Sequence, residues 1–271
     1  MCMKTTLDCL VCFYKQALYT ARLSTTSEER QKEILARLGS LLPQLDLNLS
    51  PPENSIQVYN LIARLSNVVD PFATLKEQSN QQALQVKDMV RDKIAATADP
   101  LYSAIVFAIA GNVIDYGSHQ EFDLDKTLAD CLRRQPIVND YHKLRADLEG
   151  AESILYLGDN CGELVFEGLL IEQLPGEVIL AVKEKAIIND ALMADALTCQ
   201  LDKICRLISN GTGCPGTPLP GCSPEFQKAF AKADLIISKG QGNFETLSHL
   251  ERRPPLYFLL TIKCHIVADY A

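Results

Sequence analysis

Apolar residues in the first half of the chain recur at intervals of three and four positions, which is the spacing of amphipathic helices. Polar residues or prolines precede several of these runs, as at Ser27 and Pro51, and such residues favour helix starts. We expect helices over residues 7–23, 27–42, 51–65, 70–94, 101–114, 125–134 and 138–148. The pattern therefore predicts a helical region over residues 1–148.

Short aliphatic runs replace this spacing from about residue 152 onward. We expect strands at residues 153–157, 178–182, 204–208, 235–238 and 256–260, with helices at 163–173, 190–198, 224–232 and 244–252 between them. Strands that alternate with helices predict βαβ units and a largely parallel sheet that is covered on both faces. The fold class is therefore α/β: a three-layer α/β/α domain over residues 149–271, on which part of the helical region packs.

Polar residues and glycines follow four of the five predicted strands. The first strand is followed by Asp159, Asn160 and Glu163, and the second by Lys183, Asn189 and Asp190. The third strand is followed by Ser209, Gly211 and Thr212, and the fourth by Lys239, Gly240 and Asn243. Because the carboxyl ends of parallel strands share the edge at which open α/β sheets bind ligands, we expect these residues to form one site.

Three of these residues, Asp159, Asn160 and Asp190, carry the hard oxygen ligands that Mg²⁺ and Mn²⁺ prefer. A metal ion held by them would neutralise a bound phosphate and polarise its phosphorus. The pair Asp159-Asn160 has a second interpretation, as the cap of the helix that follows. Glu163 is a candidate base, a candidate orienting group and a candidate partner of the helix dipole, and the sequence does not separate these roles.

Lys239 precedes two glycines, Gly240 and Gly242, between a predicted strand and a predicted helix. Glycine backbone N–H groups can approach an anion at a helix N-terminus, and a lysine there adds positive charge. This pattern favours a phosphate contact at Lys239, with a plain tight turn as the alternative. The same two interpretations apply to residues 209–213.

Asn112 and Asp115 end the most apolar of the predicted helices, and their spacing of three places them on one face. One interpretation is that they cap the helix or bond to a neighbouring loop. The other is that they form the wall that the helical region presents to the site, where they would contact substrate.

The net charge of −8 and the pI of about 5.1 disfavour binding to nucleic acid or to anionic membranes. No apolar run approaches the roughly 20 residues that span a bilayer. The first residues lack the apolar stretch of a signal peptide, so we expect a cytoplasmic protein. Its partner is then a small molecule, and the oligomeric state is open, a homodimer being one option.

Ten cysteines occur in a long chain with a full complement of aliphatic residues, which indicates reduced thiols rather than a disulfide framework. Cys9 and Cys12 form the only closely spaced pair. A single CxxC pair is weak evidence for zinc. Packing of the first helix is one interpretation; a second metal site or a redox site with Cys264 is the other.

Four short motifs together resemble those of the metal-dependent damage-control phosphatases, formerly domain of unknown function 89. The motifs are Asp159-Asn160-Cys161-Gly162-Glu163, Asn189-Asp190-Ala191, Lys239-Gly240-Gln241-Gly242-Asn243-Phe244-Glu245 and Gly111-Asn112-Val113-Ile114-Asp115. The resemblance extends to Asp8-Cys9-x-x-Cys12 and to Lys263-Cys264, and it is typical of a compact, cysteine-bearing, prokaryotic-like branch.

This resemblance implies a helical N-terminal region packed on an α/β domain, and a divalent metal such as Mn²⁺, Mg²⁺, Co²⁺ or Ni²⁺. It implies that Asp159, Asn160 and Asp190 bind the metal and that Lys239 contacts the phosphate. The implied activity is metabolite repair by hydrolysis of phosphate monoesters, including sugar phosphates and damaged metabolites. A water is the expected nucleophile, with Asp159 as the alternative.

Two further hypotheses come from other classes of protein. A carboxyl methyltransferase, described for a eukaryotic branch, would need an adenosyl cofactor, but the first strand is not followed by a glycine-rich loop. A non-catalytic metal- or phosphate-binding protein would instead depend on Cys9, Cys12 and Cys264.

Overall fold

The computed structural model describes residues 3–111, 136–250 and 254–271. The helix predicted at residues 125–134 lies outside the described residues, as do Asn112 and Asp115. No helix in the described ranges is long and apolar enough to cross a membrane.

Five parallel strands form one sheet in the order β3-β2-β1-β4-β5. The strands are β1 (Ser153–Leu157), β2 (Glu177–Val182), β3 (Arg206–Ser209), β4 (Leu235–Lys239) and β5 (Leu256–Leu259). The predicted parallel sheet is therefore confirmed. The strand order reverses at β1, which pairs with both β2 and β4, and such a reversal opens a crevice at the carboxyl ends of the strands.

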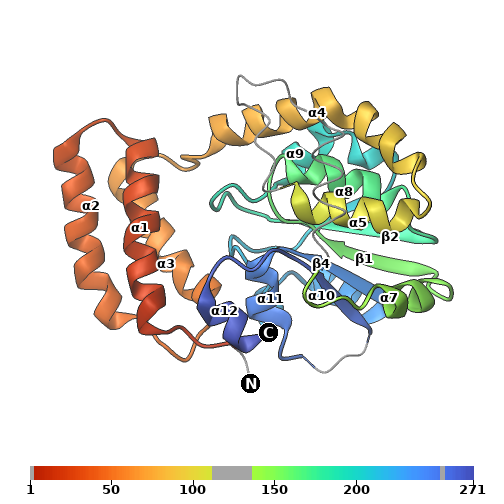
Figure 1. The fold of residues 1–271 in the computed structure, drawn as a ribbon. Helices are drawn as coiled ribbons and strands as arrows, with labels where there is room; N and C mark the ends of the chain where they lie inside the picture. Colours follow the sequence, from red (N-terminus) through yellow and green to blue (C-terminus); the bar gives the residue numbers. More distant parts are fainter. Residues whose placement is uncertain (1–2, 112–135, 251–253) are drawn as a thin grey trace.

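Helices cover both faces of the sheet (Figure 1). The helices are α1 (Leu7–Ser24), α2 (Glu28–Leu41), α3 (Pro51–Ser66), α4 (Ala73–Ala95), α5 (Pro100–Ala110), α7 (Tyr141–Leu148), α8 (Glu163–Ile171), α9 (Met193–Thr198), α10 (Pro224–Lys232), α11 (Gln241–Leu247) and α12 (His265–Tyr270), with short 3₁₀ turns at Leu42–Gln44, Leu201–Lys203 and Leu219–Gly221.

Strand β1 shows how the three layers arise from the alternation of its side chains. Ile154 and Tyr156 pack into the core that α4, α5, α7 and α8 share with the sheet. Leu155 and Leu157 point to the opposite face and pack into the core formed with α10 and α11. A strand buried on both faces reads as a continuous apolar run, as SILYL does.

Helices α1 to α3, which we call the three-helix cluster, enclose a hydrophobic core of their own and lie beside the sheet domain (Figure 1). Helix α4 connects the two parts and packs on α5, α8 and α9 of the sheet domain. Part of the predicted helical region therefore packs on the α/β domain, as expected; the boundary between residues 148 and 149 stays a prediction.

Two helices next to the predicted site begin elsewhere than expected. The helix predicted from residue 190 begins at Met193, because Asp190 pairs with Asn160 in an isolated backbone bridge. The helix predicted from residue 244 begins at Gln241, since the φ of +84° at Gly240 turns the chain directly from β4 into α11. The third strand also begins late, at Arg206, after a 3₁₀ turn.

We predict that Gly176→Ala destabilises the protein, because Gly176 precedes β2 with a φ of +78° and a Cβ there would lie 2.6 Å from the carbonyl oxygen of Glu152. The free energy of unfolding in urea should fall by more than about 1 kcal/mol. Gly150→Ala is the matched control, since a Cβ at Gly150 has nothing within 4 Å. Equal losses in both variants would contradict the prediction.

Candidate functional site

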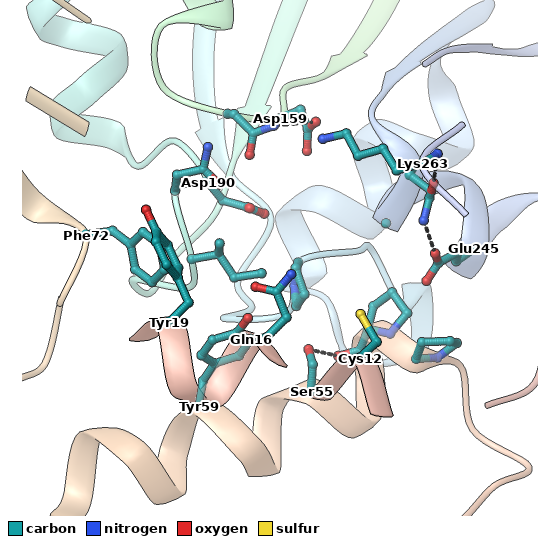
Figure 2. Close-up of a pocket in the computed structure, with 18 of the residues that line it drawn as sticks. Cys12, Gln16, Tyr19, Ser55, Tyr59, Phe72, Asp159, Asp190, Glu245 and Lys263 are labelled. Atoms are coloured by element: carbon teal, nitrogen blue, oxygen red, sulfur yellow. Dashed lines mark hydrogen bonds between the residues drawn. The ribbon is translucent and has the colours of Figure 1, made fainter. Parts of the chain in front are cut away.

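A cleft of about 600 Å³ lies between the carboxyl ends of the strands and the three-helix cluster. Asp159, Asn160, Asn189 and Asp190 line it from the strand side, where Figure 2 shows Asp159 and Asp190 facing the cavity. The carboxyl ends of β1 and β2 thus contribute to one site, as the strand pattern predicts.

The first loop of the site follows β1 and carries Asp159 and Asn160. The side-chain nitrogen of Asn160 donates to Asp159 Oδ2 at 2.9 Å and to Glu163 Oε1 at 2.7 Å. Both bonds use the amide nitrogen, so they leave the Oδ1 acceptor of Asn160 for another partner. The N-cap of α8 is Gly162, and the side chains of Asp159 and Asn160 accept no hydrogen bond from the first turn of this helix, so the interpretation of Asp159-Asn160 as a helix cap is wrong.

The second loop of the site follows β2 and runs alongside the first. The N–H of Ala191 donates to the carbonyl of Asp159, and the N–H of Cys161 donates to the carbonyl of Asn189, both at 2.9 Å. This backbone pairing places Asp190 beside Asn160. Within the described residues, Asp190 Oδ2 accepts no hydrogen bond, and the ammonium of Lys183 is 3.8 Å away.

Burial strongly raises the pKa of the carboxyl groups of Asp159 and Asp190. Loss of hydration, together with the nearby carboxylate of Glu163, raises the pKa of Asp159 to about 6. Loss of hydration likewise raises the pKa of Asp190 to about 8, although Lys183 opposes the shift. These carboxylates therefore lie where added positive charge would be strongly stabilising.

Lys239, the last residue of β4, is 1% exposed and does not line the cleft. Its ammonium donates to Glu163 Oε2 at 2.9 Å and lies 3.8 Å from Glu167 Oε1. It borders a small recess of about 10 Å³ next to Asp159. The phosphate contact predicted for Lys239 stays a prediction; the contact that the structure shows is with Glu163.

Gly240 follows Lys239, and its lack of a side chain makes room for Asp159. A Cβ on Gly240 would lie 2.2 Å from Asp159 Oδ2, where no atom fits. The residue therefore allows the turn and also the close packing of the carboxyl group against the backbone.

Lys183 and Asn243 lie behind the wall of the cleft. The ammonium of Lys183 donates to the carbonyl of Gly216 at 2.8 Å and to Asn243 Oδ1 at 3.3 Å. Asn243 Oδ1 also accepts from the hydroxyl of Thr217 at 2.7 Å, and its nitrogen donates to the carbonyl of Lys239 at 2.8 Å. Both side chains thus hold the loop that follows β3 against the end of the sheet.

The remaining predicted substrate-binding residues from the third strand form a turn outside the cleft lining. The hydroxyl of Ser209 accepts from the N–H of Gly211 at 3.0 Å, and Thr212 bonds to Asn210 through its N–H. Gly211 has a φ of +82°, and a Cβ there would lie 2.7 Å from Ser223. The interpretation as a turn fits these contacts, and a role in substrate binding stays a prediction.

The fold brings the cysteines of the second predicted site near one another, since burial and the neighbouring Cys9 and Cys264 raise the pKa of Cys12. Cys12 lines the cleft, and Cys264 Sγ lies 3.9 Å from the side-chain nitrogen of Gln241. Among residues 3–111, 136–250 and 254–271, no three His, Cys, Asp or Glu side chains are arranged to hold a metal ion. A second metal site or a redox role at Cys9, Cys12 and Cys264 stays a prediction.

Asn80 on α4 contacts both loops of the site, which the sequence did not indicate. Its Oδ1 accepts from the N–H of Gly162 at 2.7 Å, and its nitrogen donates to Asp195 Oδ1 at 3.1 Å. Asp195 Oδ2 accepts in turn from the N–H of Leu192 at 2.9 Å. One side chain on α4 thereby connects the turn after Asn160 to the turn after Asp190.

The sequence carries a weak signal for the network around Asn80 and Asp195. Lys76 and Asn80 lie four positions apart on one face of α4, and both are buried. The ammonium of Lys76 lies 3.5 Å from Asp195 Oδ2 and 3.0 Å from Asp70 Oδ2. Polar residues on the buried face of an amphipathic helix need partners, but the sequence does not say which.

Sequence reasoning also missed Glu167 and the side chains that the three-helix cluster contributes to the cleft. Glu167 is fully buried on α8, four residues after Glu163, within an otherwise apolar helix. Tyr19 and Tyr59 line the cleft from α1 and α3, and Lys263 lines it from the segment before α12. No local pattern could place these residues opposite the strand ends.

Comparisons with known proteins agree over nearly the whole chain. Residues 5–271 match the model of the damage-control phosphatase ARMT1-like domain. A damage-control phosphatase of Pyrococcus horikoshii is 34% identical over 272 residues, which is 98% of this chain and 93% of the relative. An uncharacterised Methanocaldococcus jannaschii protein is 33% identical over 97% of this chain and 90% of its own. The crystal structure of a DUF89 family protein from Pyrococcus horikoshii has a TM-score of 0.92 and 33% identity, with 99% and 95% of the two chains covered.

We predict that Asn80→Ala destabilises the protein, because it removes the hydrogen-bond partner of the buried N–H of Gly162 and of Asp195 Oδ1. An unsatisfied buried polar group costs about 1–3 kcal/mol in the free energy of unfolding, which urea denaturation would measure. Gln81→Ala on the exposed side of α4 serves as the control and should change the stability little. A stability of Asn80→Ala equal to that of the control would refute the role of the network.

Proposed function

Because the chain belongs to the damage-control phosphatase ARMT1-like family, we propose that it hydrolyses phosphate monoesters of small metabolites with the help of a divalent metal ion. This membership confirms the resemblance inferred from the four motifs. Relatives named damage-control phosphatase, from Pyrococcus horikoshii and Archaeoglobus fulgidus, are 34% and 30% identical and each cover 98% of this chain.

The observation that carries the proposal is the excess of buried negative charge at the edge of the sheet. Four buried carboxyl groups, Asp159, Glu163, Glu167 and Asp190, are accompanied by two buried ammonium groups, Lys183 and Lys239. With all of them ionised, the two buried ammonium groups leave two of the four buried negative charges uncompensated. Buried charge of this kind is strongly unfavourable unless a cation compensates it.

The oxygen donors present fit a divalent cation. Asp159 and Asp190 offer carboxylates, Asn160 offers the Oδ1 that its own hydrogen bonds leave open, and Asp190 Oδ2 accepts no hydrogen bond within the described residues. Hard oxygen donors of this type suit Mn²⁺, Mg²⁺, Co²⁺ or Ni²⁺. When bound, the ion would supply charge neutralisation and polarisation of the phosphate.

Glu163 is best explained as an orienting group. One carboxylate oxygen accepts from Asn160 and the other accepts from Lys239, so neither is directed at a water in the cleft. The three side chains form a buried chain of hydrogen bonds that holds the amide of Asn160 in one orientation. We therefore assign to Glu163 and Lys239 the positioning of Asn160 rather than proton transfer.

The reaction proposed is attack of a water on phosphorus, in line with the ester oxygen. The P–O bond to the organic group breaks, phosphate is formed, and the departing alcohol takes up a proton. Lys263 lines the cleft, and Figure 2 shows its side chain extending toward Asp159, which places positive charge near the phosphate oxygens.

We predict that Asp190→Asn abolishes both metal binding and phosphatase activity, because it removes one charged ligand. Calorimetric titration with Mn²⁺ and phosphate release from a panel of phosphate monoesters would measure the two effects. Asp202→Asn, which changes an exposed carboxylate elsewhere on the surface, is the control and should leave both unchanged.

Two other outcomes would contradict the metal requirement or the phosphatase function. Full turnover in the presence of EDTA would contradict the metal requirement. Binding of an adenosyl cofactor without any phosphate release would instead support the carboxyl methyltransferase alternative.

A separate prediction concerns the nucleophile. If Asp159 binds the metal and a water attacks, the intact mass of the protein should be unchanged when turnover is stopped with acid. A gain of one phosphoryl group on the peptide that contains Asp159 would identify it as the nucleophile instead. The same quench without metal is the control.

A further inference from the structure

Lys263 is the positive charge that the cleft presents to an anionic ligand. Among the described residues that line the cleft it is the one basic side chain, and it also borders the small recess next to Asp159. Figure 2 shows its side chain extending toward Asp159. Within the described residues, no hydrogen bond or ion pair uses its ammonium. The ammonium is therefore available to a phosphate held at Asp159 and Asp190.

The segment that carries Lys263 has few contacts to hold it in place. Residues 260–263 lie between β5 and α12, belong to no helix or strand and are mostly exposed. For these residues the structure describes one hydrogen bond to another element, in which the N–H of Lys263 donates to Gln241 Oε1 at 2.8 Å. The position of the Lys263 backbone, and with it the reach of the ammonium, thus depends mainly on one side chain.

The amide of Gln241 has one orientation in this arrangement. Its nitrogen donates to Glu245 Oε1 at 2.8 Å, four residues further along α11, and lies 3.9 Å from Cys264 Sγ. Turning the amide over would direct its nitrogen at the N–H of Lys263 and its oxygen at the carboxylate of Glu245. Glu245 is 7% exposed, so the bond that orients the amide is largely shielded from water.

Gln241 also belongs to the turn that packs against a candidate metal ligand. It is the first residue of α11 and directly follows Gly240, whose lack of a side chain makes room for Asp159. Gln241 and Lys263 both border the recess next to Asp159. One turn of backbone thus contacts the carboxyl group of Asp159 and, through the amide of Gln241, holds the chain at Lys263.

We propose that Gln241 is a positioning residue that acts through Lys263 and holds its ammonium beside the phosphate group of the bound ester. The inference rests on the proposed phosphatase function. Lys263 supplies the positive charge, and the amide of Gln241 sets the backbone from which the lysine side chain extends. A displacement of about 1 Å in such a group can lower the rate of a reaction about a hundredfold, so a single tether of this kind affects catalysis.

A double-mutant cycle tests whether Gln241 acts through Lys263. With Mn²⁺ present, Gln241→Leu removes both hydrogen bonds of the amide at similar volume and should lower kcat/KM for p-nitrophenyl phosphate about tenfold. Lys263→Ala should lower it about a hundredfold, and the double variant should lose no more than Lys263→Ala alone, because the amide then has no ammonium to position. Glu245→Gln, which keeps an acceptor for the amide, should lose less than Glu245→Leu. Gln44→Leu changes an exposed glutamine that does not line the cleft and is the control.

Two results of the cycle would overturn the proposal. Losses that multiply in the double variant would show that Gln241 acts independently of Lys263, by contacting the ester itself or by supporting the fold. A Gln241→Leu variant with the same kcat/KM as the Gln44→Leu control would show that the amide does not contribute.

Two further measurements separate this inference from the proposed function. Calorimetric binding of inorganic phosphate in the presence of Mn²⁺ should be weakened by Gln241→Leu only where Lys263 is retained, and this result would support the proposal even if no ester is hydrolysed. A wild-type protein that binds phosphate but hydrolyses no ester would refute the phosphatase function alone, whereas one that binds no phosphate would overturn both.

The second measurement needs neither metal nor ligand. Hydrogen exchange of the backbone amides at residues 260–264 should be faster in Gln241→Leu than in Gln44→Leu, because the bond to the N–H of Lys263 is lost. Equal exchange in the two variants would show that the amide does not hold this segment and would overturn the proposal.

Discussion

The backbone pairing between the loops after β1 and β2 is the constraint on which the site depends. Two hydrogen bonds of 2.9 Å, from Ala191 to Asp159 and from Cys161 to Asn189, place one aspartate of each loop at the same edge of the sheet. The pairing requires that Asp190 lie outside the following helix, which explains the late start of α9. It also confines two carboxyl groups to a buried position where loss of hydration raises the pKa of both, and the charge of Asp159 contributes to the rise at Asp190.

The buried groups around Asp159 and Asp190 compensate part of the negative charge of these two carboxylates. Lys183 lies near Asp190, while Lys239 is bonded to Glu163, which also holds the amide of Asn160. Buried hydrogen-bonded networks of this kind specify one arrangement of side chains, since each member left unpaired would be costly. Asn80 extends the same principle to the helical layer, because its amide bonds to both loops at once.

The division of the chain into two hydrophobic cores gives the cleft its two chemically different sides. The sheet domain contributes oxygen ligands and charge, whereas the three-helix cluster contributes aromatic rings such as Tyr19 and Tyr59. The two parts of the chain therefore contribute different chemistry to one cleft.

The sequence by itself determined the elements and the polar edge of the sheet. Aliphatic runs such as SILYL predict buried strands, and Asp159, Asn160 and Asp190 directly follow two of them, so parallel pairing alone brings these residues to one edge. The tertiary structure decided what these side chains contact. Lys239 pairs with Glu163 and Asn80 reaches Gly162, because partners distant in the chain meet only after packing. The position of Tyr19 at the cleft was decided in the same way, because helical spacing shows which face of α1 is apolar but not that part of this face borders the cleft.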